Sequence, residues 1–475
     1  MDEFILKILK HRRIFLFVWV FAILLLLILA FLHLNYGLGD EKSEEFYHSR
    51  MASEIANSGK IPSIDTGTIE NRSYNINPYH ILLAIFISFF GKEFSIIILP
   101  LILGIIMLLV FILTLNQMGI DKERVVLIVF LTIITPNFLT TFSTLNDSSL
   151  VLVLMFLSFY LLITFKSWIL QFLSFLIFTL ALFFNLFAAL IAIAFLFLGY
   201  SIEKTKTSIS RLGIVLLVFV AFLYYVNVPL SNLLIHSKEP YLGVLLSDVG
   251  SFVGFSTFFL VLSLIGMGVF WKRKSELWLI YLIAFLLFLG FFLFKNLVVS
   301  YALLFLGMFA GFGFYRIIIS QWKLNLLKDL TILLILCGLL FSTISYLNRV
   351  NNVEFNPGLL EALQWMEKNG KEGNVLSYQG YGFAIEYITG QPVVADSFST
   401  EKYVNLSNNL FGLRNIDKVK DLSKEYNIRY ILITPEMRNG LIWSRNEEGM
   451  LFLLKNSENF NKVFDKDNYE VWEIK

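Results

Sequence analysis

Residues 39–50, GDEKSEEFYHSR, directly follow an apolar run that extends from Ile14 to Leu32. They carry four carboxylates, one imidazole and one guanidinium within eleven residues, in a chain of 475 residues that is 57% hydrophobic and 16% charged. Charged groups beside a bilayer are costly unless they face water, an ion or a ligand. The pattern predicts a polytopic membrane protein whose first loop binds a divalent metal and a phosphate-bearing lipid at the membrane surface.

Apolar runs near 20 residues recur along the first three-quarters of the chain. A helix of about that length is long enough to cross roughly 30 Å of hydrocarbon. We predict about 11 transmembrane helices, near residues 14–33, 94–117, 124–142, 148–166, 168–183, 185–200, 211–229, 251–270, 276–294, 297–315 and 328–347. The fifth and sixth runs are alternatively one broken span. The first run resembles a signal peptide, but its full length favours a retained anchor.

Charge placement predicts the orientation of the chain in the cell membrane. Basic residues such as Lys122 and Arg316 lie in alternate connections, whereas acidic residues such as Asp40 and Asp248 lie in the others. By the positive-inside rule the N-terminus is cytoplasmic, and the acidic loops and the C-terminal tail lie outside. The first outer loop covers residues 34–93.

The predicted domains are a transmembrane domain, residues 1–348, and a small extracytoplasmic α/β domain, residues 349–475. Within the first loop we predict a helix over 43–57, ended by Gly59 and Pro62, and an interfacial apolar segment over 79–90. The tail is predicted to contain helices at 357–368 and 417–426 and strands at 374–378, 392–395 and 429–433. Dispersed basic residues make a nucleic-acid partner improbable.

Three residues are candidate metal ligands: Glu44, His48 and Asp147. Carboxylates with an imidazole at an aqueous face suit Mg²⁺ or Mn²⁺, which prefer oxygen ligands. Glu44, Tyr47 and His48 are spaced to share one helix face. Two alternatives stay open, namely that the first loop is merely solvated and that the Asn146–Ser149 stretch is a helix cap.

Two further polar residues lie on the predicted outer side. Glu239 is a candidate contact to the substrate, and the alternative is a solvated turn. Lys295 is a candidate to neutralise a lipid phosphate, and the alternative is that its side chain snorkels to the interface.

Several motifs together resemble the catalytic subunits of oligosaccharyltransferases, a family of GT-C membrane glycosyltransferases, and most of all the archaeal AglB branch. Residues 44–50, EEFYHSR, are similar to the family pattern Asp-x-Tyr-Tyr-His-x-Arg, and residues 77–84 to Pro-Leu-Tyr-(Tyr/His)-x-Leu-Leu-Ala. Residues 143–149 fall where the family has its Asp-x-Asp motif, and residues 376–396 resemble the stretch around its Trp-Trp-Asp-Tyr-Gly signature.

The resemblance implies a GT-C-like fold and transfer of a sugar or oligosaccharide from a polyprenyl-phosphate carrier of the dolichol type. The acceptor is a protein, lipid or glycan at the outer face. In this scheme Glu44 and Asp147 are catalytic and hold the metal with His48. Arg50, Glu239, Lys295 and Tyr381 bind substrate.

The chain departs from the family pattern at three places. Glu44 replaces an Asp, Ser149 replaces the second acid of Asp-x-Asp, and residues 378–380, YQG, replace Trp-Trp-Asp. In the family that signature recognises the Ser or Thr of the acceptor sequon, so the nature of the acceptor stays open. The alternatives are a non-catalytic relative and a protein that binds or transports lipid-linked sugars. A transporter fits less well, because its charges are expected near the bilayer midplane.

Overall fold

The computed structural model describes residues 12–36, 42–181, 183–184, 186–202, 241–251, 254–271, 279–351, 355–445 and 447–475. The chain forms two compact units. The first comprises Met1–Leu34, Asn77–Tyr79 and Glu93–Asn352, and the second comprises Asn35–Ile76, His80–Lys92 and Val353–Lys475. Most of the first loop, which the sequence analysis placed in the transmembrane domain, therefore groups with the C-terminal domain.

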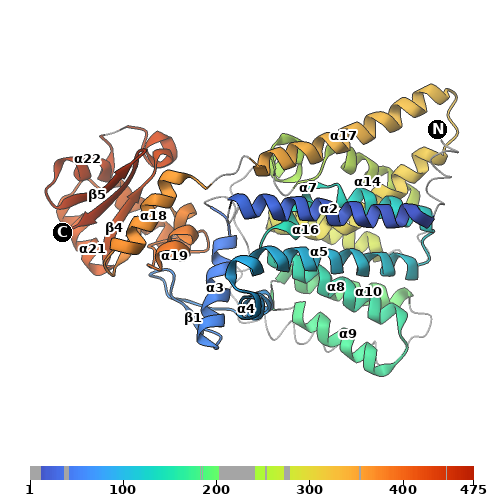
Figure 1. Ribbon diagram of the computed structural model, residues 1–475, viewed down its shortest axis with the longest axis horizontal. Helices are drawn as coiled ribbons and strands as arrows, with labels where there is room; N and C mark the ends of the chain where they lie inside the picture. The colour runs from blue at the N-terminus through green and yellow to red at the C-terminus, as the bar shows by residue number, and fades with distance from the viewer. Residues whose placement is uncertain are drawn as a thin grey trace. The chain divides into compact units, whose positions relative to one another are not determined.

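The first unit is built from apolar helices (Figure 1). They are α2 (Arg12–Tyr36), α5 (Lys92–Gln117), α6 (Lys122–Ile133), α7 (Pro136–Ser143), α8 (Asp147–Thr164), α9 (Trp168–Ala181), α10 (Leu186–Ile202), α13 (Tyr241–Leu245), α14 (Thr257–Phe270), α16 (Leu279–Ile319) and α17 (Asn325–Asn351). Among the described residues four helical segments are long and apolar enough to cross a membrane, and the bent pair α6–α7 makes a fifth. The chain is a multi-pass membrane protein. The count of 11 spans stays a prediction, and the run 211–229 lies outside the described residues.

Residues 124–142, predicted as one span, form two helices bent by 69°. Pro136 begins α7, and its ring disfavours a helical conformation at the preceding Thr135, which is extended at φ −77° and ψ 136°. The Thr135 hydroxyl accepts a hydrogen bond from the Phe138 amide and caps α7. The break therefore follows from local sequence that the hydrophobic pattern alone does not reveal.

Three other predicted spans differ from the structure. The described part of the run 276–294 and the run 297–315 lie in one helix, α16 (Leu279–Ile319), of 41 residues that contains no proline. Among the described residues of the run 251–270 the helix begins at Thr257, and Phe255 just before it forms a bridge with Leu246.

Helices α14 and α16 pack closely through glycine. A Cβ atom on Gly266 would collide with the Phe309 carbonyl oxygen, and one on Gly313 would collide with the Leu262 carbonyl oxygen. The Ser263 hydroxyl donates to the Leu306 carbonyl at 2.9 Å across the same pair. Small residues at such contacts let helix backbones approach in a membrane protein.

The second unit contains a four-stranded sheet in the order β3-β4-β6-β5 (Figure 1). The strands are β3 (Asn374–Leu376), β4 (Ile428–Ile433), β5 (Phe460–Lys466) and β6 (Tyr469–Ile474). Strand β3 pairs parallel with β4, and the other pairs are antiparallel. Asp467 and Asn468 have positive φ values of 52° and 65° and close the β5–β6 hairpin, as two-residue hairpin turns require.

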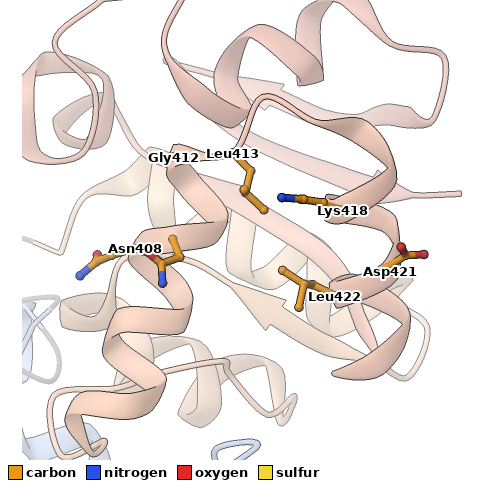
Figure 2. A pocket seen from close by; sticks show the side chains of 7 residues that line it. Asn408, Gly412, Leu413, Lys418, Asp421 and Leu422 are labelled. Atoms are coloured by element: carbon orange, nitrogen blue, oxygen red, sulfur yellow. The ribbon is translucent and has the colours of Figure 1, made fainter.

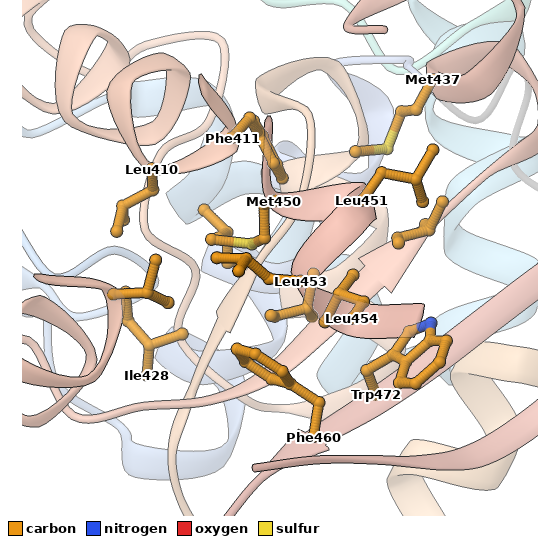
Figure 3. Packing of buried hydrophobic residues seen from close by; sticks show 14 of the residues in the cluster. Leu410, Phe411, Ile428, Met437, Met450, Leu451, Leu453, Leu454, Phe460 and Trp472 are labelled. Carbon is orange, nitrogen blue, oxygen red and sulfur yellow. The ribbon is translucent and has the colours of Figure 1, made fainter. Parts of the chain in front are cut away.

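Hydrophobic side chains cover both faces of this sheet. Along β4, Ile431 and Ile433 join a core with Phe460 and Trp472 (Figure 3). Tyr430 and Leu432 point to the opposite face and join the second core. This alternation is the period of two that a strand buried on both faces produces.

The helices of the second unit are α3 (Glu45–Ser58), α4 (Pro78–Phe90), α18 (Pro357–Asn369), α19 (Gly382–Thr389), α20 (Glu401–Gly412), α21 (Ile416–Glu425) and α22 (Gly449–Asn456). The predicted helices near 43–57, 357–368 and 417–426 are confirmed, as are the strands near 374–378 and 429–433. The predicted strand at 392–395 is wrong. Val393 makes only isolated bridges, to Thr68 and Val375.

Candidate functional site

Helix α3 carries the first-loop candidates. Glu44 stands at its N-cap, where its carbonyl accepts a hydrogen bond from the His48 amide at 3.1 Å. Gly59 ends the helix in the left-handed conformation at φ 65°, as the sequence predicts. Glu44 is exposed, whereas His48 is buried at 5% exposure. Of these two candidate ligands, only Glu44 is exposed to solvent.

His48 lies in a buried chain of polar rings. Its Nδ1 is 2.8 Å from Nε2 of His80, and Nδ1 of His80 is 2.7 Å from the Tyr74 hydroxyl. Burial, and then the neighbouring His48 and Arg50, hold the pKa of His80 well below its ordinary value, so His80 is neutral. This row of hydrogen-bonded side chains fixes the orientation of the His48 ring.

Asp147 lies in the first turn of α8, in the first unit. The preceding Asn146 caps this helix by accepting the Ser148 amide at 2.8 Å, so Asp147 itself is not the cap. The Asn77 side-chain amide donates to Asp147 at 3.3 Å. Ser149, at the position of the second acid, is fully buried and donates to the Asn146 carbonyl at 2.6 Å. This motif therefore contributes one accessible carboxylate.

The metal prediction depends on residues from both units, since Glu44 and His48 belong to the second and Asp147 to the first. Across the described part of the chain, no group of three or more His, Cys, Asp or Glu side chains is arranged to hold a metal ion. The donor set itself, two carboxylates and an imidazole, fits a hard divalent cation.

A buried ion network lies beside α3. The Arg50 guanidinium is 2.7 Å from Asp65 and 3.0 Å from Glu386. Arg72 binds Asp65 at 2.7 Å and Asp396 at 2.6 Å. All three carboxylates are at most 2% exposed. The predicted substrate contact Arg50 is thus held by these two buried carboxylates, and the half-exposed Glu54 lies 4.0 Å from its other guanidinium nitrogen.

The ionisation of this network follows from its charge count. Burial raises the pKa of Asp65, but Arg50 and Arg72 outweigh that effect and leave the pKa below its ordinary value. Burial raises the pKa of Glu386 well above its ordinary value, against the attraction of Arg50. Two arginines thus face three buried carboxyl groups, Asp65, Glu386 and Asp396, and the raised pKa of Glu386 favours its protonated form.

Tyr381 lies where β3 and β4 end. It is 1% exposed, and its hydroxyl donates to Glu436 at 2.8 Å. Lys42 binds the same Glu436 oxygen at 2.7 Å and lies 5.2 Å from the Tyr381 ring centre. The hydrogen bond from Lys42 lowers the pKa of Glu436. Burial raises that pKa and the Tyr381 hydroxyl lowers it, so the pKa lies below its ordinary value and this half-exposed carboxylate is ionised.

Two predicted substrate contacts remain, Glu239 and Lys295. Glu239 lies outside the described residues. Lys295 lies within α16, but its side chain also lies outside them. His80 and Asp396 lie within motifs of the sequence but were given no role there, and Asp65, Arg72, Glu386 and Glu436 were not predicted as site residues. Single charged residues without a local pattern carry no signal of a shared site.

A separate open pocket of about 640 Å³ lies between α20 and α21 (Figure 2). Its lining residues are Asn408, Asn409, Gly412, Leu413, Lys418, Asp421 and Leu422. They include neither Tyr381 nor Glu44, so this pocket is distinct from the candidate residues above.

The fold is similar to that of solved membrane glycosyltransferases. The apo oligosaccharyltransferase of Archaeoglobus fulgidus aligns with a TM-score of 0.66 and 15% identity, over 90% of this chain and 70% of that chain. That enzyme has also been solved with Zn and sulfate, and AglB of the same organism with an inhibitory peptide and a dolichol-phosphate. ArnT from Cupriavidus metallidurans bound to undecaprenyl phosphate aligns with a TM-score of 0.57 and 11% identity, over 98% of both chains.

No family model and no curated protein sequence matches the chain. At these identities the structural similarity establishes the fold alone. The chain has the GT-C fold of AglB and ArnT, as the motifs predicted.

Proposed function

We propose that this protein is a membrane glycosyltransferase that moves a sugar or oligosaccharide from a polyprenyl-phosphate carrier to an acceptor at the outer face. The observation that carries the proposal is the GT-C fold, since AglB and ArnT structures with this fold hold dolichol-phosphate and undecaprenyl phosphate. In the proposed orientation the N-terminus is cytoplasmic and the C-terminal domain is outside.

The donor side of the reaction needs stabilisation of negative charge. Glycosyl transfer passes through an oxocarbenium-like transition state while the phosphate leaving group gains charge. Glu44, Asp147 and His48 would hold Mg²⁺ or Mn²⁺, which supplies Lewis-acid stabilisation of that charge when bound. A solved oligosaccharyltransferase with this fold contains Zn and sulfate, which supports the general proposal of a metal. Lys295 and Glu239 complete the proposed contacts to the substrate.

Glu44 has a second proposed role. Because it is exposed at the start of α3, it can accept a hydrogen bond from the acceptor nucleophile and orient or deprotonate it. Arg50, two residues beyond His48, supports the same helix. The proposed catalytic residues are therefore Glu44 and Asp147.

The acceptor side is assigned to the C-terminal domain around Tyr381. The loops that leave neighbouring parallel strands β3 and β4 meet here, which is where open α/β sheets bind ligands. The ionised Glu436 is oriented by Tyr381 and Lys42 through one oxygen. An oriented, half-exposed carboxylate suits an acceptor that presents a hydroxyl or amine.

A second candidate function is binding of a lipid-linked sugar without transfer. It is favoured by one observation, the buried Ser149 that replaces an acid and turns its hydroxyl to the backbone. Both functions require binding of the lipid-linked sugar, but only the first transfers that sugar to an acceptor.

Transfer itself tests the proposal. The full chain in lipid nanodiscs is supplied with a radiolabelled dolichyl-phosphate-linked sugar, Mn²⁺ and a peptide that contains Asn-Val-Thr, and label on the peptide or released to water is measured. We expect label transfer by the wild type and its loss in Glu44→Gln and Asp147→Asn. Donor binding without release or transfer by the wild type would instead establish the non-catalytic function. Transfer that survives both substitutions would overturn the site assignment.

A further inference from the structure

The buried ion network joins parts of the chain that are distant in sequence. Arg50 lies on α3 and Arg72 on β2 (Arg72–Ser73), whereas their partners Glu386 and Asp396 come from the C-terminal domain. Arg72 and Asp396 are 324 positions apart and are linked by two hydrogen bonds, of 2.8 and 2.6 Å.

Backbone and ring contacts connect the same segments. The Val393 amide donates to the Gly67 carbonyl at 2.8 Å, and the Ile69 amide donates to the Val393 carbonyl at 3.0 Å. On α3, the Phe46 ring meets the Tyr387 ring edge-on at 5.3 Å. The first loop is therefore bound to the C-terminal domain both along its helix α3 and at the turn between β1 (Ile64–Asp65) and β2.

The network is a poor device for stability alone. Desolvating buried ions costs several kcal/mol for each ion, and apolar replacements of similar volume are often neutral or stabilising. Two arginines between fixed carboxylates hold the surrounding segments in one arrangement, because each guanidinium presents its hydrogen-bond donors in a rigid fork. The Arg72 fork takes Asp65 and Asp396 at once, and Asp65 in turn holds Arg50.

The network holds helix α3 in place, because Arg50 belongs to both. Arg50 is about 1.7 turns beyond Glu44 and about half a turn beyond His48 along the same helix. A displacement of about 1 Å at reacting groups can cost about 100-fold in rate. We infer that the C-terminal domain positions α3 for the reaction and that Arg72 and Arg50 are positioning residues, acting through the helix on Glu44 and His48. This inference rests on the proposed function and gives Arg50 a role other than direct substrate contact.

The test compares arginine variants in the full chain in nanodiscs. Arg72→Gln and Asp396→Asn each break the network, and Arg72→Lys keeps the charge without the fork. The matched control is Arg429→Gln, which breaks an arginine–carboxylate pair of 3.1 Å with Glu473 in the same domain. Two quantities are measured: hydrogen exchange of the α3 amides, and kcat and KM with the dolichyl-phosphate-linked sugar.

We expect Arg72→Gln and Asp396→Asn to speed α3 exchange and to lower kcat by about 100-fold while KM for the donor changes little. Arg72→Lys should recover part of both losses, and Arg429→Gln should change neither quantity. If the Arg72→Gln variant does not fold, the Asp396→Asn and Arg72→Lys variants provide the test. Network variants that match Arg429→Gln in α3 exchange and kcat would overturn the positioning role. Absence of transfer by the wild type would instead overturn the proposed function.

Discussion

Replacing Glu386 by Gln tests the charge balance of the buried network. Arg50 and Arg72 already balance Asp65 and Asp396, and burial raises the pKa of Glu386 well above its ordinary value of 4.5. Neither Glu386 oxygen has a hydrogen-bond partner among the described residues, although Arg50 lies 3.0 Å away. A protonated Glu386 resembles Gln in shape and charge, so the substitution should cost no more than about 1 kcal/mol.

The opposite assignment predicts a different magnitude. If Glu386 were ionised and paired with Arg50, its removal would leave a buried charge uncompensated and cost about 3–5 kcal/mol. Hydrogen exchange of α19 and β3 amides in the full chain reports the opening free energy of this region. A loss of that size in Glu386→Gln would refute the charge count.

The same substitution changes the pH dependence. Because the folded-state pKa of Glu386 is raised, its contribution to stability is complete below the ordinary value of 4.5 and is lost as pH rises through the folded pKa. The opening free energy of the wild type should therefore fall as pH rises above 4.5, and that of Glu386→Gln should fall less. Asp65 acts in the opposite sense, since its lowered pKa makes stability fall only as pH drops below its ordinary 3.8. Equal pH slopes for the two proteins would contradict the reasoning.

Three further substitutions have defined outcomes. Gly67→Ala places a Cβ within 2.8 Å of the Arg50 guanidinium carbon, so the first loop should lose about 1–3 kcal/mol and be cleaved faster in limited proteolysis; an unchanged cleavage rate would contradict the packing. Thr135→Val removes the α7 cap and should cost about 1 kcal/mol, seen as faster exchange of α7 amides with α8 unaffected. Tyr381→Phe should raise KM for the acceptor peptide about 3- to 10-fold without changing that for the donor, whereas Tyr430→Phe, which removes another buried hydroxyl that accepts a hydrogen bond from the Lys371 amide, should change neither.

Local signals predicted a large part of the fold. Gly59 ends α3 because glycine takes the left-handed conformation without steric cost, and the helices at 357–368 and 417–426 follow from their amphipathic pattern and flanking cap residues. The errors have local causes as well. Pro136 bends a run that hydropathy alone joins. Lys295 and Asn296 do not interrupt α16, because two polar residues within apolar sequence do not by themselves break a helix.

The candidate site was predictable only in part. Glu44, His48 and Asp147 were found because motifs surround them. The partners of Arg72 and Tyr381 were not, since Asp396 and Glu436 reach them across 324 and 55 positions and leave no spacing pattern in the sequence. Val393 looked like a strand residue because β-branched side chains favour strands, yet it pairs only through isolated bridges.

Metal binding by the intact protein tests the central claim most directly. Mn²⁺ affinity is measured by electron paramagnetic resonance for the wild type, Glu44→Gln, Asp147→Asn and the double variant in nanodiscs. If both carboxylates hold one ion, each single substitution should weaken binding by at least about tenfold, and the two effects should not add, because they act on the same ion. Wild-type affinity in either single variant, or no Mn²⁺ bound by the wild type, would contradict the account.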